Sequence, residues 1–252
     1  MKALITGASS GIGKEMAYYL ASKGIDLILV ARSIDKLEEI KDKVDVDVKT
    51  IKLDLANEKN VFKLYMLTKD DDIDILINNA GFGLFGKFYE TDLNKELEMI
   101  NVNIEAVHLL TKLYLRDMQK KDSGYILNVA SMAAFGPGPL MATYYATKAY
   151  VNNLTEAINE ELRRQKSNVF VCSLCPGPVD TNFNNVAGVS FSVKPLTSDE
   201  VAYYAIKSMF KKKVVIIPGF KMRFTMFIRR FASRSLIRKI TYNVQKSKIS
   251  KK

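Results

Sequence analysis

The chain has 252 residues, 48% hydrophobic and 26% charged, which is enough to bury the core of one α/β domain. It contains no run of about eighteen apolar residues, which excludes a membrane-spanning helix. The formal net charge is +11, but no acidic residue follows Glu200, and residues 1–200 alone carry a net charge of −4. The basic character therefore belongs to the C-terminal part, and without an accompanying binding motif it does not indicate a nucleic-acid partner.

The chain contains one histidine and two cysteines. His108 falls within an apolar helical pattern, which argues against a catalytic histidine triad. Cys172 and Cys175 are three residues apart in a predicted strand and point to opposite faces of it, so we expect neither a redox nor a metal site. Because the chain enters its first strand at once, we expect no signal peptide and a location in the reducing cytoplasm.

The first strand is predicted over Lys2–Thr6 and the first helix over Lys14–Lys23, with a glycine-rich turn between them. Backbone N–H groups at a helix start, together with the helix dipole, bind phosphate. The spacing Thr-Gly-x-x-x-Gly-x-Gly differs from the common G-x-G-x-x-G, but its place at the start of a βαβ unit favours a nucleotide site. The candidate cofactor contacts are Gly7, Ser9, Ser10, Gly11, Ile12 and Gly13.

The second predicted strand, Asp26–Ala31, is followed directly by Arg32. Enzymes specific for NAD usually carry an acidic residue at this point, which binds the ribose hydroxyls. The acidic group is missing here, and an arginine can pair with a 2′-phosphate, so the sequence favours NADP(H) over NAD(H). The alternative is a solvent-exposed arginine that opens the helix predicted over Ser33–Val44.

Asp47–Leu53 and Asp72–Ile77 are the third and fourth predicted strands, and a helix from about Asn57 to Lys69 joins them. The fourth is almost wholly apolar, as is typical of a strand buried in a parallel sheet. Each ends in residues that could lie against a cofactor. These are Asp54 and Leu55 after the third strand, and Asn79, Ala80 and Gly81 after the fourth.

A long helical pattern runs from about Asp92 to Met118 and carries Asn101 and Asn103 in its middle. Asparagine competes with the helix backbone for hydrogen bonds and is unfavourable there unless it has a partner.

The stretch from Tyr125 to Tyr150 joins a predicted strand, Tyr125–Ala130, to a helix that starts near Thr143 and reaches about Arg164. Ser131 follows the strand directly, and the intervening Gly136-Pro137-Gly138-Pro139 forbids a helix. Tyr144 and Lys148 are four residues apart and lie on one helix face. A nearby ammonium can lower a tyrosine pKa from about 10 toward neutrality. Ser131 could then bind the substrate oxygen that Tyr144 protonates, although on spacing alone the pair could equally be an ordinary exposed one.

Two further strands are predicted, over Val169–Cys175 and Lys213–Ile217, and between them a helix capped by Ser198 or Asp199 and ending near Phe210. The first of these strands leads into Pro176, Gly177, Val179 and Thr181, which are further candidate cofactor contacts.

The alternation of seven strands with helices predicts a single α/β domain, with a doubly wound Rossmann-type parallel sheet of order 3-2-1-4-5-6-7 and helices on both faces. Ligands bind at the carboxyl ends of such strands. Six of the candidate sites follow strands directly and therefore converge on one edge of this sheet. They are Thr6–Gly13, Arg32, Asp54, Asn79–Gly81, Ser131 and Pro176–Thr181.

With these motifs in order, the sequence resembles the short-chain dehydrogenase/reductase family of the roughly 250-residue type, over about residues 2–181. The resemblance depends on motifs at family spacing: Thr6-Gly7-x-x-x-Gly11-x-Gly13, Asn78-Asn79-Ala80-Gly81, Ser131, Tyr144-x-x-x-Lys148 and Pro176-Gly177. It implies hydride transfer between a nicotinamide cofactor and a carbonyl or alcohol, without a metal. Members of this family commonly form dimers or tetramers, so a homo-oligomer is expected.

The resemblance also implies roles for the catalytic candidates. Tyr144 would be the general acid, Ser131 would orient the substrate oxygen, and Lys148 would lower the tyrosine pKa and hold the nicotinamide ribose. A fourth residue, an asparagine of the long helix that supports a water near the lysine, is assigned to Asn103 in preference to Asn101. Pro176, Gly177, Val179 and Thr181 would face the nicotinamide end, and Asp54 and Leu55 the adenine.

The segment 182–225 is expected to cover the substrate, and its Phe, Met and Val content suggests a small apolar carbonyl or alcohol substrate. The tail, 220–252, is basic and amphipathic. Its apolar stripes are Phe224, Phe227, Ile228 and Phe231, then Leu236, Ile237, Ile240 and Val244. Two interpretations stay open: helices that pack over the cleft or on a partner subunit, and a peripheral contact with an anionic membrane. A nucleotide-binding sensor without turnover, or a protein that acts through its tail, is the alternative function.

Overall fold

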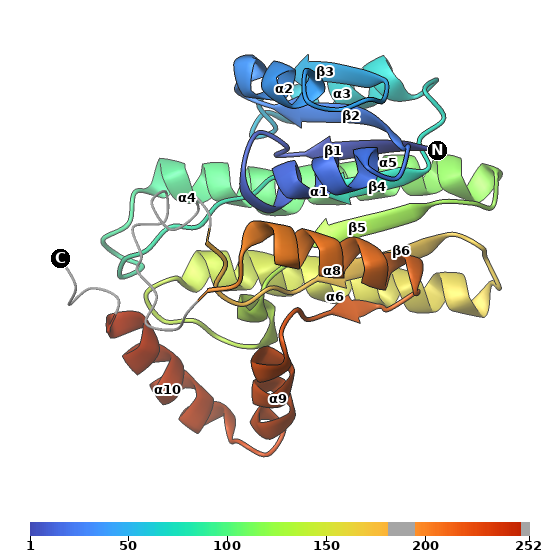
Figure 1. Cartoon of the computed structure of the whole chain (residues 1–252). Helices are drawn as coiled ribbons and strands as arrows, with labels where there is room; N and C mark the ends of the chain where they lie inside the picture. The colour runs from blue at the N-terminus through green and yellow to red at the C-terminus, as the bar shows by residue number, and fades with distance from the viewer. Residues whose placement is uncertain (181–194, 248–252) are drawn as a thin grey trace.

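A computed structural model describes residues 1–180 and 195–247. In this part of the chain seven parallel strands form one sheet of order β3-β2-β1-β4-β5-β6-β7, which confirms the predicted fold class and strand order (Figure 1). Each predicted strand is present, with ends that differ from the prediction by up to three residues. The strands are β1 Lys2–Thr6, β2 Asp26–Ala31, β3 Val48–Lys52, β4 Ile75–Asn78, β5 Tyr125–Val129, β6 Phe170–Leu174 and β7 Val215–Ile216.

Helices cover both faces of the sheet, so most strands are apolar on both sides. Along β2, Leu27 and Leu29 pack into one core while Ile28 and Val30 pack into the other, following the two-residue alternation of a strand. The first core lies under α1 Gly11–Ala21, α2 Ile34–Lys41 and α8 Ser198–Phe210. The second lies under α3 Glu58–Thr68, α5 Val107–Lys120 and α6 Ala142–Arg164.

The prediction of one long α-helix from Asp92 to Met118 is wrong in one respect, because the helix is not α-helical throughout. Its first part, α4 Leu93–Ile100, and its last part, α5, are separated by a π-helical segment, η1 Asn101–Ala106. Segments of this kind are often found at functional sites. Both asparagines have partners, since the Asn101 amide donates to the Ala56 carbonyl and Asn103 bonds the chain at Phe82.

Two helix starts also differ from the prediction. The first helix begins at Gly11, three residues early, because the glycine turn leads straight into it. The helix α8 is capped by Thr197, and not by Ser198 or Asp199. The Thr197 hydroxyl accepts from the Glu200 backbone N–H while the Glu200 carboxylate accepts from the Thr197 N–H, which forms a capping box.

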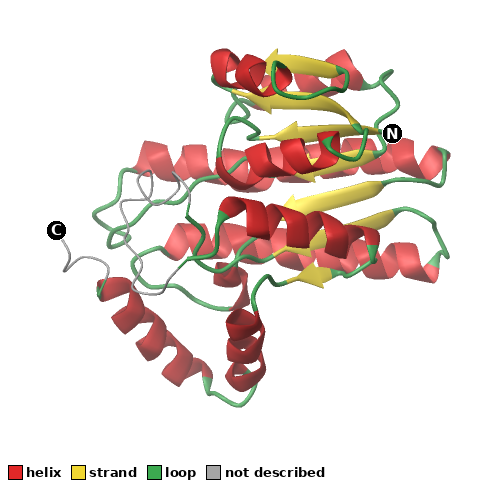
Figure 2. Cartoon of the chain, in the orientation of Figure 1, coloured by secondary structure: helices red, strands yellow, loops and turns green. Residues whose placement is uncertain are grey.

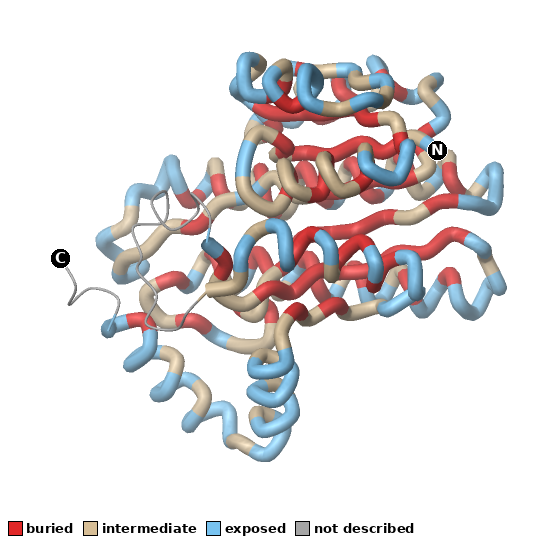
Figure 3. Tube along the Cα trace, in the orientation of Figure 1, coloured by how far each residue is buried: buried red, intermediate tan, exposed pale blue. Residues whose placement is uncertain are grey.

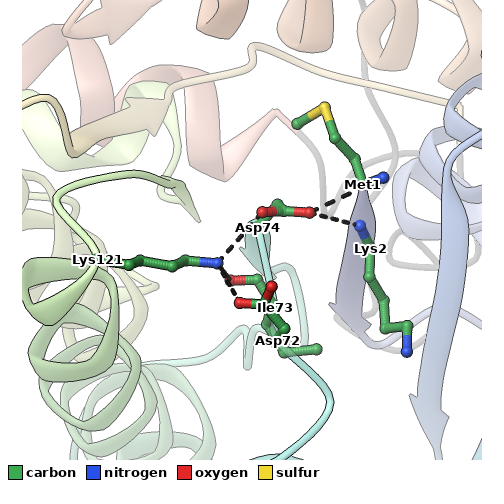
Figure 4. A network of polar contacts seen from close by, with 6 residues as sticks. All are labelled: Met1, Lys2, Asp72, Ile73, Asp74 and Lys121. Atoms are coloured by element: carbon green, nitrogen blue, oxygen red, sulfur yellow. Dashed lines mark hydrogen bonds and ion pairs between the residues drawn. The ribbon is translucent and has the colours of Figure 1, made fainter.

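A polar network ties together the amino ends of the strands, on the sheet edge away from the candidate site (Figure 4). The Lys121 ammonium lies 2.7 Å from an Asp72 oxygen and 3.2 Å from an Asp74 oxygen, and Asp74 also accepts from the Lys2 backbone N–H at 2.9 Å. These contacts explain why Asp74 occurs in an otherwise apolar stretch. Asp74 precedes β4, and its carboxylate connects β1 to the end of α5. None of the network's residues lines the large cavity described below.

The last two helices, α9 Phe220–Arg229 and α10 Arg234–Lys246, extend beyond the sheet as a V-shaped pair (Figure 2). Figure 3 shows that they are largely exposed, whereas the strands are buried. Phe231 keeps 80% of its surface exposed, and Gln245 is the one buried residue on the two helices. Within residues 1–180 and 195–247, no helix has both the length and the hydrophobicity needed to cross a bilayer.

Candidate active site

The turn between β1 and α1 is shaped for a phosphate. Gly7 and Gly11 have positive φ angles of 64° and 55°, which glycine adopts without strain. A Cβ at Gly7 would lie 2.8 Å from the Ala80 Cα, and a Cβ at Gly13 would overlap the Asn79 amide. The glycines therefore let the turn pack closely against the loop after β4. Gly7, Ser9, Ser10, Gly11 and Ile12 line a cavity at the start of α1, where backbone N–H groups suit the pyrophosphate of a dinucleotide.

Asn79 holds this turn in place. Its side-chain nitrogen lies 3.0 Å from both the Thr6 and the Gly7 carbonyl oxygens, and the Thr6 hydroxyl accepts from the backbone N–H groups of Asn79 and Ala80. The loop after β4 is thus locked to the turn after β1. The sequence placed Asn79 against a cofactor, and the structure uses its side chain to position the phosphate turn.

The cavity wall near the end of β2 is rich in charge. Arg32, Lys36 and Lys95 line it together with Asp54 and Glu98. The Arg32 side chain is 70% exposed and its guanidinium lies 3.4 Å from a Glu98 carboxylate oxygen. An exposed ion pair of this kind contributes roughly 0–1 kcal/mol, so a phosphate dianion can compete for Arg32.

Ser131 and Tyr144 meet at the carboxyl end of β5. Ser131 caps a short 3₁₀ helix, η2 Met132–Phe135, by accepting from the Ala133 N–H at 3.1 Å. Tyr144, in the first turn of α6, is 9% exposed. Burial raises the pKa of Tyr144 to about 12, and a hydrogen bond with Ser131 partly opposes that rise. The phenol is therefore protonated at neutral pH.

Lys148 lies one turn further along α6 and is 4% exposed. Its ammonium donates to the Val129 carbonyl at 2.8 Å and lies 5.9 Å from the centre of the Tyr144 ring. Burial lowers the pKa of Lys148 to about 8. Burial thus disfavours the charged form of both groups, and a lowering of the Tyr144 pKa by the Lys148 ammonium stays a prediction.

Asn103 is fully buried and bonds the loop after β4. Its oxygen accepts from the Phe82 N–H at 3.1 Å, and its nitrogen donates to the Phe82 carbonyl and to the Thr147 hydroxyl. A Cβ at Gly81 would lie 2.9 Å from the Asn103 oxygen and 3.3 Å from the Lys148 nitrogen. The π-helical segment thus brings Asn103, and not Asn101, close to the lysine.

One cavity of about 1020 Å³ contains nearly all of these groups. It runs from the glycine turn past Ser131, Tyr144 and Lys148 to the inner faces of α9 and α10. Of the predicted site residues, Gly13 and Asn103 do not line it, and Thr181 and the start of the substrate-covering segment fall outside the described residues. The predicted residues that line it are Gly7, Ser9, Ser10, Gly11, Ile12, Arg32, Asp54, Leu55, Asn79, Ala80, Gly81, Ser131, Tyr144, Lys148, Pro176, Gly177 and Val179.

Sequence reasoning missed several residues that complete the site. Thr147 and the Val129 carbonyl hold Asn103 and Lys148, and neither has a motif that would reveal it. Tyr145, Arg229 and Gln245 line the same cavity beside Tyr144. The tail helices therefore pack over the cleft through their inner faces, as one of the two interpretations of the tail expects.

Known proteins share this sequence pattern and this fold. The family model described as short chain dehydrogenase matches residues 1–188. The chain belongs to the short-chain dehydrogenase/reductase family. It is therefore an oxidoreductase that acts on alcohol or carbonyl groups with a nicotinamide cofactor.

Among the relatives of this dehydrogenase is the human very-long-chain 3-oxoacyl-CoA reductase, which is 36% identical over 192 residues, covering 73% of this chain and 61% of that protein. A short-chain dehydrogenase from Sphingobium yanoikuyae in complex with NADPH superposes with a TM-score of 0.82 and 29% identity, covering 91% of this chain and 92% of that one. One from Burkholderia phymatum in complex with NAD has the same TM-score and coverage with 25% identity.

Proposed function

We propose that this dehydrogenase interconverts apolar carbonyl compounds and alcohols with NADP(H), using Tyr144 as the general acid–base. The observation that carries the proposal is the meeting of Ser131 and Tyr144 in a cavity that continues to the glycine turn. Gly7, Gly11 and Gly13 would hold the pyrophosphate, and Lys148 would hold the ribose near the nicotinamide. When bound, the cofactor supplies the hydride.

The side chains supply the rest of the chemistry. Ser131 hydrogen-bonds the substrate carbonyl oxygen, which orients it and stabilises the negative charge that develops there. Tyr144 gives its proton to that oxygen. Even with the pKa of Tyr144 raised to about 12, its phenolate is a weaker base than the alkoxide formed from the substrate, so the proton transfer is favourable. The Lys148 ammonium favours the phenolate left behind, and Asn103 holds the loop that borders it. The protonated phenol at neutral pH favours carbonyl reduction.

Arg32 supports a preference for NADP(H) over NAD(H). The end of β2 offers Arg32 and Lys36 where an acidic residue would suit a 2′-hydroxyl. Arg32 is exposed and its only ion pair, among the described residues, is the weak one with Glu98. A 2′-phosphate would be a stronger partner for its planar guanidinium than that single carboxylate.

The middle of the cavity supports an apolar substrate. Phe82, Leu84 and Met141 pack in one apolar cluster with Tyr144, and Ile228 and Ile240 line the same cavity. The names of similar proteins also support an apolar substrate. The human relative is named a very-long-chain 3-oxoacyl-CoA reductase, and a Comamonas testosteroni alcohol dehydrogenase at 28% identity is described as specific for bulky-bulky ketones. We propose a hydrocarbon-rich aldehyde or ketone.

A panel of aldehydes and ketones assayed by the loss of NADPH absorbance tests the proposal. Turnover of aliphatic ketones that is lost in Tyr144→Phe is the expected result. Tight NADPH binding without turnover of any compound would instead favour a nucleotide-binding sensor.

We also propose a peripheral membrane contact through the outer faces of α9 and α10. Phe220, Phe224 and Phe227 are more than half exposed, Phe231 is 80% exposed, and no acidic residue lies among the surrounding lysines and arginines. A symmetric dimer through this face would set basic surface against basic surface, whereas anionic lipid is complementary. The homo-oligomer proposed for this family member would therefore use another surface, which light scattering can test.

Sedimentation with vesicles of phosphatidylserine and phosphatidylcholine tests the membrane contact. The chain should sediment with the anionic vesicles, and Phe227→Ser with Phe231→Ser should reduce this, since neither residue lines the cavity. Equal binding by the double variant, or none by either, would contradict the proposal.

A further inference from the structure

Three polar side chains that the proposed chemistry does not use meet in the cavity wall beside Tyr144. Tyr145 lies on α6, Arg229 at the end of α9 and Gln245 near the end of α10. The Gln245 side-chain nitrogen donates to the Tyr145 hydroxyl at 2.7 Å. The positive charge of Arg229 and this hydrogen bond both oppose the rise that burial causes in the pKa of Tyr145, which places all three side chains together.

The loop after Ser131 is built around this group. A Cβ at Gly136 would overlap the Arg229 guanidinium, and a Cβ at Gly138 would overlap the Tyr145 ring. The φ angle of Gly136 is 170°, which any residue adopts, so that glycine is needed for space and not for its backbone conformation. Residues about one hundred positions apart are therefore packed into one surface of the cavity.

Arg229 has no counter-ion in the described part of the chain. No acidic side chain follows Glu200, and residues 181–194 contain none either, so neither segment can supply a carboxylate side chain. Arg229 is only partly exposed, and this burial lowers the pKa of its guanidinium. A partly buried cation without a partner is unfavourable, and a ligand anion would relieve it.

Gln245 is also incompletely bonded. It is 2% exposed, and its side-chain oxygen has no hydrogen-bond partner among the described residues. The oxygen and nitrogen of a side-chain amide have nearly the same size and can exchange positions by a half-turn of the amide group. After that turn, the Gln245 oxygen would accept from the Tyr145 hydroxyl and the nitrogen would be a free donor. In the turned orientation the Gln245 nitrogen could donate to an anion.

We propose that Arg229 and Gln245 form a subsite for an anionic group on the substrate, a carboxylate or a phosphate, while the substrate carbonyl lies at Tyr144. The planar guanidinium matches either anion, and the Gln245 amide adds a donor. Ile228, Ile237 and Ile240 line the wall nearby and would contact a hydrocarbon chain between the two groups. The substrate class is thus an oxo acid or oxo alkyl phosphate. This inference rests on the proposed function.

The test compares aliphatic oxo acids of increasing chain length with their methyl esters, and with oxo alkyl phosphates, in the NADPH assay. The wild type should prefer an anion of the right length by about 10–100-fold in kcat/KM over the ester, the usual size of a charged hydrogen bond. Arg229→Gln should bring the ratio close to one, and Arg229→Lys should restore part of it. General loss of structure would lower both rates and leave the ratio unchanged.

Two further variants make the comparison specific. Arg230→Gln removes the neighbouring exposed charge, which does not line the cavity, and should keep the ratio. Gly136→Ala retains the charge of Arg229 but displaces its guanidinium, and should lower the ratio. Comparing carboxylates with phosphates shows which anion the subsite takes.

Calorimetry with octanoate separates this inference from the proposed function. Octanoate should bind the wild type and bind Arg229→Gln more weakly, whether or not any ketone is turned over. Equal binding by the two proteins, or an acid-to-ester ratio near one in the wild type for every chain length and both anions, would overturn the subsite. Turnover of the esters in that case would leave the proposed reductase standing.

Discussion

The sheet with its covering helices differs from the α9–α10 pair in how far its side chains are buried. In the sheet, Leu29 and Val171 have no exposed surface. Among the candidate catalytic groups, Ser131 follows β5, which is paired on both sides, and Tyr144 and Lys148 are nearly buried on α6. On α9 and α10 the aromatic side chains are largely exposed, and only the inner faces touch the cavity. The proposed reaction therefore depends on the buried part, and the proposed recognition of the substrate's anionic group on the more exposed part.

Tyr144→Phe should produce the largest effect if the chemistry depends on the buried part. The change removes one hydroxyl from a buried ring, so folding and cofactor binding should persist while kcat falls about 10²–10⁴-fold, the usual contribution of a general acid. NADPH absorbance measures the rate. Tyr150→Phe on the same helix, whose hydroxyl bonds His108 at 2.7 Å, is the matched control and should keep its activity. Full activity in Tyr144→Phe would remove the assignment.

A pair of truncations measures the difference in packing directly. Leu29→Ala, in the centre of the first core, should lower the free energy of unfolding by about 2–5 kcal/mol, because it removes buried methyl groups and leaves a cavity. Phe231→Ala removes a larger side chain that is exposed and should change it by less than about 0.5 kcal/mol. Urea denaturation gives both values. Similar losses for the two variants would show that the tail is packed as tightly as the core.

The buried ammonium of Lys148 should make both activity and stability depend on pH. Its pKa is lowered to about 8 in the folded chain, so the unfolded chain binds more protons between pH 8 and 10.5. The free energy of unfolding should therefore rise by about 3 kcal/mol over that window, while carbonyl reduction falls as the ammonium is lost. Lys148→Met should be inactive, bind NADPH more weakly and be more stable at pH 7. A flat stability profile in the wild type would contradict the burial of this charge.

Arg32→Ala should have a smaller effect that is confined to cofactor choice. Losing the partner of a 2′-phosphate should weaken NADPH binding by about 10–100-fold and leave NADH binding nearly unchanged. Fluorescence titration with both cofactors measures the ratio. Glu98→Gln, which frees Arg32 from its ion pair, should shift the ratio slightly toward NADPH. The preference for NADP(H) fails if the wild type binds both cofactors equally.

Most of the sheet and the main site residues could be predicted from the sequence because their signals are local. A strand buried on both faces is a short apolar run, a phosphate turn needs glycine, and residues four apart share a helix face. The parallel order then places every strand's carboxyl end on one edge. These rules place Ser131 at that edge and Tyr144 and Lys148 on one helix face, and all three line the cavity.

What only the tertiary structure decided depends on contacts between distant residues. The π-helical segment that turns Asn103 toward Phe82, the use of Asn79 to hold the phosphate turn, and the raised pKa of Tyr144 all come from burial and partners that no local pattern encodes. The hydrogen bond between Tyr145 and Gln245 spans one hundred residues of sequence. The apolar stripes of the tail were visible in the sequence, but their inner and outer faces became distinct only through contacts with α6 and the loop after Ser131.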